Sequence, residues 1–203
     1  MMRYLKNKMA RKSFDANKQV GMDKDYSMRE YTPESLVRDL LKLIPFEKSD
    51  LVVDAGSGIK KVWFENIPTD NKEEVELDEG KDFYLYNTQV DWVVGNPPFP
   101  EFIGFIKHSA DICRKGFGFL TNHSRINQLT PKRLQDLADK GFYLSKIHIF
   151  GVKKWFGRYY FVLFTKNRCE GISWSKINYS DELKTEVGIP PKPKVLGILP
   201  NFI

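Results

Sequence analysis

Hydrophobic and polar positions along the chain predict helices and strands that alternate. Apolar residues recur at helical spacing from Leu36 to Ile44, and two short apolar runs, Leu51–Val53 and Trp92–Val94, each end near glycines. Further on, the pattern predicts two helices, Phe102–Arg114 and Pro131–Lys140, and three strands, Gly116–Leu120, Tyr143–Val152 and Arg158–Lys166. This alternation predicts an α/β fold. A largely parallel sheet would be covered on both faces, with the site at the carboxyl ends of its strands.

The segment after Trp92–Val94 carries the most specific signal in the chain. It consists of Asn96, Pro97, Pro98 and Phe99. Each proline holds its φ near about −65° and lacks an N–H, and a residue before a proline is pushed towards an extended conformation. Asn96 and Pro97 therefore offer acceptor oxygens in nearly fixed directions beside the ring of Phe99, which suits a planar amine. A turn that only ends a strand is the other interpretation.

The turn after Leu51–Val53 has the composition of a ligand-binding loop. Asp54 is followed by Gly56 and Gly58, and glycines permit positive φ and let the backbone approach a ligand closely. Such a turn is weak evidence by itself. Here it precedes Asn96 by about 40 residues, and the pair of turns, rather than either one, indicates a functional site.

Asn96, Pro97, Pro98 and Phe99 resemble the (D/N)PP(Y/F) signature of the S-adenosylmethionine-dependent adenine-specific (N6-adenine) DNA methyltransferases. The resemblance implies a class I methyltransferase fold: a Rossmann-like, mostly parallel sheet with a late antiparallel hairpin and helices on both faces. It implies S-adenosyl-L-methionine as the cofactor, held by the turn that contains Gly56 and Gly58, which is called the glycine loop below. It also implies that Asn96 and the carbonyl of Pro97 accept hydrogen bonds from the 6-amino group of adenine, while Phe99 stacks on the base.

The segment Tyr31–Pro33 resembles the part of these enzymes that closes over the methionine portion of the cofactor. An amphipathic helix explains the same residues, with Thr32 as its N-cap and Pro33 at the first helical position. Both interpretations of Tyr31 and Thr32 stay open on the sequence.

The segment Glu76–Phe83 resembles the family's E-x-D turn followed by G-x-D-F. By that resemblance, Glu76 holds the ribose hydroxyls of the cofactor and Leu77 packs on its adenine. Asp82 accepts from the adenine amine and Phe83 covers the other face. A solvated acidic turn is the alternative. The implied cofactor site comprises Tyr31, Thr32, Asp54, Gly56, Gly58, Glu76, Leu77, Asp82 and Phe83.

The loop Lys153–Gly157 joins the last two predicted strands and holds aromatic residues between cations. Enzymes that act on a base in a duplex extrude it, and aromatic side chains commonly stack on the extruded ring. We predict this substrate-binding role for Trp155 or Phe156, with Arg158 beside them. Burial at the end of a strand is the other interpretation for either ring.

Composition favours one soluble domain with a polyanionic partner. The 203 residues suffice for one core, and the net charge is +6 with a pI near 9.1. No apolar stretch approaches the roughly 20 residues that span a bilayer. The amino terminus is charged instead of resembling a signal segment, so we expect a cytoplasmic protein without a membrane partner. Two cysteines and three histidines show no metal-ligand spacing, and no metal is expected.

Three parts are expected along the chain: a basic flexible arm at 1–28, a methyltransferase domain at 29–169 and an extended tail at 170–203. The predicted reaction is methyl transfer to the 6-amino group of adenine in DNA. Because no segment is left for a separate target-recognition domain, the expected partners are DNA and either a specificity subunit or a second copy forming a homodimer. The alternatives are adenine methylation in structured RNA, methylation of a protein glutamine amide, and a catalytically silent subunit that binds nucleic acid or a partner enzyme.

Overall fold

The computed structural model describes residues 31–153, 155, 157–167 and 172–179. The predicted basic arm (1–28), Phe156 and the end of the predicted tail from residue 180 lie outside the described residues. The chain divides into two units between Tyr31 and Thr32. The fold and the site described below belong to the second unit.

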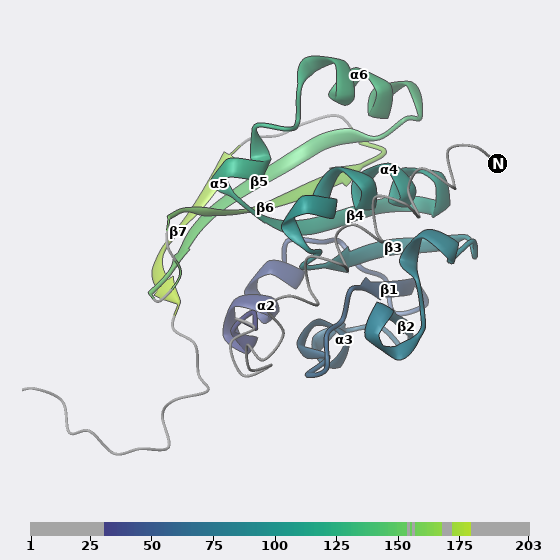
Figure 1. Ribbon diagram of the computed structural model, residues 1–203, viewed down its shortest axis with the longest axis horizontal. Helices are drawn as coiled ribbons and strands as arrows, with labels where there is room; N and C mark the ends of the chain where they lie inside the picture. The colour runs from purple at the N-terminus through teal and green to yellow at the C-terminus, as the bar shows by residue number, and fades with distance from the viewer. Residues whose placement is uncertain (1–30, 154, 156, 168–171, 180–203) are drawn as a thin grey trace, which may run out of the picture. The chain divides into compact units, whose positions relative to one another are not determined.

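Seven strands in the described part of the chain form one sheet, in the order β2-β1-β3-β4-β6-β5-β7 (Figure 1). They are β1 (Leu51–Ala55), β2 (Asn71–Val75), β3 (Val90–Gly95), β4 (Cys113–Asn122), β5 (Tyr143–Val152), β6 (Tyr159–Thr165) and β7 (Ile172–Tyr179). Neighbouring strands are parallel except around β6, which runs antiparallel to both β4 and β5. The predicted late antiparallel hairpin is therefore confirmed as β5 and β6.

Helices cover both faces of this sheet, as predicted. They are α2 (Glu34–Leu41), α3 (Val62–Asn66), α4 (Phe102–Ile112), α5 (His123–Ile126) and α6 (Pro131–Asp139), with short 3-10 turns η2 (Leu77–Glu79), η3 (Phe83–Leu85) and η4 (Phe99–Glu101). Successive strand residues point to opposite faces, so Val52 joins Leu36 of α2 in one core cluster while Val53 joins Phe105 of α4 in the other. Both faces are buried, which is why the central strands are apolar without alternation.

Local sequence signals explain where the later elements begin and end. The hydroxyl of Thr130 accepts from the backbone N–H of Arg133 at 3.4 Å, as expected of the N-cap of α6. Gly141, with φ of +79°, lies just beyond the end of this helix. Helix α4 ends two residues earlier than Arg114, because β4 begins at once at Cys113.

The sheet continues into the segment that was predicted to be an extended tail. Strand β7 (Ile172–Tyr179) pairs in parallel with β5, so the boundary expected at residue 169 is wrong for these eight residues. Along the stretches of chain that the structure describes, no helix is long and apolar enough to cross a membrane.

Candidate active site

Strands β1 and β3 are parallel neighbours, so the turns that follow them meet at one edge of the sheet. Asp54 pairs with Val94, one residue before Gly95. A Cβ at Gly95 would lie 2.6 Å from the carbonyl oxygen of Ala55 and 3.1 Å from Oδ1 of Asp54, and the φ of Gly95 is +149°. Only glycine fits this close approach. The sequence-predicted glycine loop and Asn96 are thus brought together.

Asn96 presents an unusual combination of burial and unused hydrogen-bonding capacity. Its Nδ2 donates to Oγ1 of Thr32 at 3.3 Å. Its Oδ1 is buried and has no hydrogen-bond partner in the described part of the chain. A buried acceptor without a partner costs roughly 1 to 3 kcal/mol, so native proteins rarely keep one without a reason. The oxygen of the Asn96 amide is therefore available to a donor from outside the described residues.

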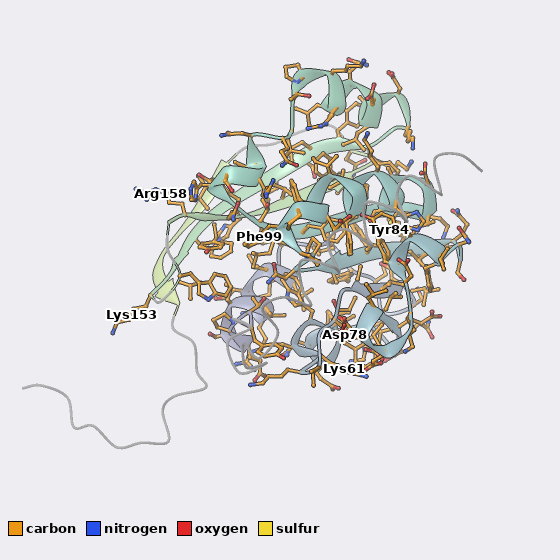
Figure 2. All side chains as sticks on the ribbon, in the orientation of Figure 1. Lys61, Asp78, Tyr84, Phe99, Lys153 and Arg158 are labelled. Atoms are coloured by element: carbon orange, nitrogen blue, oxygen red, sulfur yellow. The ribbon has the colours of Figure 1, made fainter. Side chains whose placement is uncertain are left out.

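The three residues after Asn96 lead into the turn η4. Pro97 is buried and Pro98 is exposed. Phe99, labelled in Figure 2, is half-buried, and its ring centroid lies 6.3 Å from that of Tyr159 at an interplanar angle of 42°. Tyr159 thus supports Phe99, whose ring still retains accessible surface.

The predicted stacking role of Trp155 is wrong. Its side chain is only 7% exposed and packs 4.7 Å from the ring of Tyr159, in the core cluster shared with α2. The ring therefore supports Tyr159, which in turn supports Phe99. Phe156 lies outside the described residues. Arg158 is exposed, as a residue that contacts a polyanion must be, and Figure 2 shows it with Lys153 at the β5–β6 end of the sheet.

The glycine loop is held by a hydrogen bond to Glu76, the residue that follows β2. Gly56 and Gly58 have φ of +77° and +65°. The N–H of Gly58 donates to Oε2 of Glu76 at 2.7 Å, and the N–H of Asp78 donates to Oε1 at 3.2 Å. Each carboxylate oxygen keeps a further lone pair. Glu76 therefore joins two loops and can still accept from a pair of hydroxyls.

Asp54 makes a structural contact at the site, and its predicted contact with the cofactor stays a prediction. Its carboxyl group is fully buried, Oδ2 accepts from the backbone N–H of Phe64 at 2.9 Å, and Oδ1 has no partner in the described residues. Burial raises its pKa from the ordinary 3.8 to about 8, the charges of Glu74 and Glu76 add to the rise, and the Phe64 hydrogen bond opposes it. Asp54 is thus protonated at neutral pH and ties β1 to α3.

The segment after Glu76 only partly matches its predicted roles. Leu77 is 59% exposed, which is high for a large apolar side chain and suits a surface that a ligand covers. Oδ1 of Asp82 accepts from the N–H of Tyr84 at 3.0 Å and caps η3. The predicted role of Phe83 is wrong: it is 4% exposed, its ring lies 4.7 Å from Phe105, and it offers a cofactor almost no surface.

Thr32 is not the N-cap of α2, since Pro33 holds that position without a side-chain bond. The Thr32 side chain is 4% exposed, and its Oγ1 accepts from Nε1 of Trp63 at 3.2 Å as well as from Asn96. Its hydroxyl thus contacts both Asn96 and Trp63, while its predicted contact with the cofactor stays a prediction. Nothing in the sequence pointed to Trp63. Tyr31 belongs to the other unit, so its approach to the cofactor stays a prediction.

The sequence analysis did not identify Ile59, a further apolar side chain at the glycine loop. Ile59 directly follows Gly58 and is 57% exposed. With Leu77, it gives two exposed apolar side chains on the two loops that Glu76 joins. A bulky residue directly after a glycine turn is the signal that could have indicated it.

A cleft of about 540 Å³ lies along β2, between that strand and the segment from Gly80 to Tyr86. Asp82 lines it, but Asn96 and the glycines of the loop do not. The meeting of the strand ends, and not this cleft, locates the candidate site. Across the residues that the structure describes, no three His, Cys, Asp or Glu side chains are grouped as metal ligands.

No family model matches the chain, and no curated protein matches its sequence. Solved structures share its fold. A protein of Pyrococcus horikoshii, described as a candidate RNA methyltransferase, has a TM-score of 0.56 at 18% identity, over 70% of this chain and 89% of its own. A candidate class I S-adenosylmethionine-dependent methyltransferase of Listeria monocytogenes has a TM-score of 0.50 at 14% identity, over 86% and 72%.

The M protein of the type I restriction enzyme EcoKI also has a TM-score of 0.50, at 13% identity, and the match covers 68% of this chain but 44% of the M protein. At such identities the likeness defines the fold alone. The chain has the class I methyltransferase fold, as the order of its strands and the helices on both faces indicate.

Proposed function

We propose that the protein transfers a methyl group from S-adenosyl-L-methionine to the 6-amino group of adenine in nucleic acid, with DNA as the favoured substrate. The observation that carries this proposal is the buried Oδ1 of Asn96, which has no partner in the described residues. Asn96 directly follows the central strand β3. An amine donor from a planar base would satisfy Oδ1, and Phe99 supplies a ring beside it.

The main contribution of the protein to this reaction would be to position the target amine against the methyl donor. The lone pair of a 6-amino group is delocalised into the purine ring, so the amine is a poor nucleophile. Oδ1 of Asn96 and the carbonyl of Pro97 would accept its two hydrogens and turn the lone pair towards the methyl donor. Holding two reactants in such a geometry is worth roughly 7 to 11 kcal/mol. The nitrogen forms its bond to the methyl carbon as the carbon–sulfur bond breaks, and the surplus proton then leaves to water.

The glycine loop and η2 fit the cofactor. S-adenosylmethionine, when bound, supplies a methyl group activated by a sulfonium. Gly56 and Gly58 allow the backbone to approach it, and Glu76 has acceptor capacity left for two ribose hydroxyls. The exposed side chains of Ile59 and Leu77 offer apolar surface to the adenine ring of the cofactor.

The charge of the protein supports a nucleic acid as the substrate. The net charge is +6, and Lys153 and Arg158 are exposed at the hairpin end of the sheet (Figure 2). Cations placed there can neutralise phosphates around an extruded base. Two structural neighbours carry descriptions that name an RNA methyltransferase and a restriction-enzyme M protein. A specificity subunit or a second copy of the chain would add recognition of a target sequence to the methyl transfer that this chain carries out.

The test is methyl transfer from labelled S-adenosylmethionine to duplex DNA, single-stranded DNA and total RNA in parallel, with the modified nucleoside identified by mass spectrometry. Methyladenine in DNA is the expected product. Methyladenine in RNA alone would move the substrate to structured RNA. Transfer to a protein glutamine, or cofactor binding with no transfer to any nucleic acid, would overturn the proposal.

A further inference from the structure

One buried hydroxyl links Asn96 to the segment that follows the glycine loop. Oγ1 of Thr32 accepts from Nε1 of Trp63 at 3.2 Å and from Nδ2 of Asn96 at 3.3 Å. Thr32 is 4% exposed and Trp63 is 3% exposed, so solvent reaches neither side chain to any extent. Three residues that are far apart in the sequence thus form a short chain of hydrogen bonds that ends on Asn96.

This chain bears directly on the orientation of the Asn96 amide. Oxygen and nitrogen of an asparagine amide have nearly the same shape, and the hydrogen-bond network decides which way the group faces. An indole N–H can only donate, so Trp63 uses one lone pair of the Thr32 oxygen. The second lone pair receives Nδ2 of Asn96. Oδ1 then faces away from Thr32 and is the buried atom without a partner in the described residues.

Trp63 is itself held firmly, which makes it a fixed reference for Thr32. It lies on α3, a few residues after the glycine loop, and its ring stacks on Phe161 with centroids 6.0 Å apart at 21°. It belongs to the core cluster that contains α2. The hydroxyl of Thr32 is therefore placed by packing on one side and presents its remaining lone pair on the other.

We propose that Thr32, held by Trp63, is a positioning residue that turns the amide of Asn96 so that its oxygen faces the target amine. This inference rests on the proposed function and deepens it. Thr32 acts through Asn96 and contacts neither the base nor the cofactor. Its removal would leave the amide free to face the other way, with its NH2 towards an NH2 group that it cannot bind.

The variants that test this are Thr32→Val, which keeps the shape and removes the hydroxyl, and Thr32→Ser, which keeps the hydroxyl. Thr69→Val is the matched control, because Thr69 is 6% exposed and bonds to the carbonyl of Asn71 at 3.1 Å before β2, at the opposite end of the parallel strands. One lost hydrogen bond corresponds to roughly a tenfold change. We expect Thr32→Val to lower kcat about tenfold, with the Kd for S-adenosylmethionine unchanged within about twofold.

Thr32→Ser should restore most of kcat, and Thr69→Val should leave kcat unchanged. A Thr32→Val protein with the kcat of the wild type would overturn the proposal. So would one in which the Kd for the cofactor rises while kcat stays the same, since that result would return Thr32 to a cofactor contact.

A second readout needs no substrate. The side-chain amide resonances of Asn96, assigned by their loss in Asn96→Ala, should shift in Thr32→Val and in Trp63→Phe, but not in Thr69→Val. Unchanged resonances in Thr32→Val would refute the positioning role even in an active enzyme. If the resonances shift in Thr32→Val but the wild-type protein methylates no nucleic acid, the positioning contact is supported and the proposed function is rejected, so the two failures are distinguishable.

Discussion

The buried carboxyl group of Asp54 predicts an unusual dependence of stability on pH. The folded chain holds its pKa at about 8, against an ordinary value of 3.8. Between these two values the folded protein keeps a proton that the unfolded chain has released. Stability contributed by this group is therefore complete below the ordinary pKa and is lost as the pH rises towards the folded pKa.

The size of the effect follows from one proton. Each pH unit inside the window changes the free energy of unfolding by about 1.4 kcal/mol. From pH 5 to pH 7 the loss amounts to about 3 kcal/mol. Asp54→Asn replaces the protonated carboxyl group with a neutral amide of the same shape, whose oxygen can still accept from Phe64, so this part of the slope should vanish.

The assay is urea unfolding of the wild type and of Asp54→Asn at pH 5, 6, 7 and 8. The free energies of the two proteins should diverge steadily with pH, in favour of the variant. Asp136→Asn, which removes an exposed carboxyl group on α6, is the control and should follow the wild type. Parallel curves for the wild type and Asp54→Asn would refute the reasoning, because they would mean that Asp54 is charged in the folded chain.

Three further predictions concern Gly95, Glu76 and Arg158. Gly95→Ala should destabilise the fold by roughly 3 kcal/mol in urea unfolding, since its Cβ would meet the backbone of Ala55. Gly80→Ala is the control: Gly80 has a φ of +81° but no atom within 4 Å of its Cβ position, so the loss should be only about 1 kcal/mol. Equal losses of stability in the two variants would contradict this reasoning. Glu76→Ala should raise the Kd for S-adenosylmethionine about tenfold or more by calorimetry, and an unchanged Kd would remove Glu76 from the site. Arg158→Gln should weaken nucleic acid binding and lower the slope of log K against log salt by about 1 in anisotropy titrations, with cofactor binding intact; an unchanged slope would exclude a phosphate contact.

The features that local sequence rules determine were predictable. Glycines and prolines act on their own backbone, so the turns at Gly56 and at Asn96 could be placed before any contact was known. The parallel pairing of β1 with β3 then brings these two turns together, because Asp54 near the end of β1 is the partner of Val94 near the end of β3. The same holds for the cap of α6 at Thr130, where side chain and N–H are three residues apart.

The roles that the sequence did not predict correctly belong to side chains that the fold buries. Trp155 and Phe83 look like ligand-stacking residues in the chain, yet each is nearly enclosed by partners such as Tyr159 and Phe105. Whether an aromatic ring in a loop faces the core or the solvent depends on long-range packing, which spacing along the chain does not encode. The role of Thr32 depends likewise on Trp63, which is 31 residues away.

Single-turnover methyl transfer by Asn96→Ala is the most direct test of the role given to Asn96. Asn87→Ala is the control, because Asn87 is exposed before the amino end of β3 and its side chain donates to the nearby carbonyl of Leu85 at 2.9 Å. We predict that Asn96→Ala binds S-adenosylmethionine as the wild type does and forms no methyladenine, while Asn87→Ala remains active. Methyladenine formed by Asn96→Ala at the rate of the wild type would contradict the account.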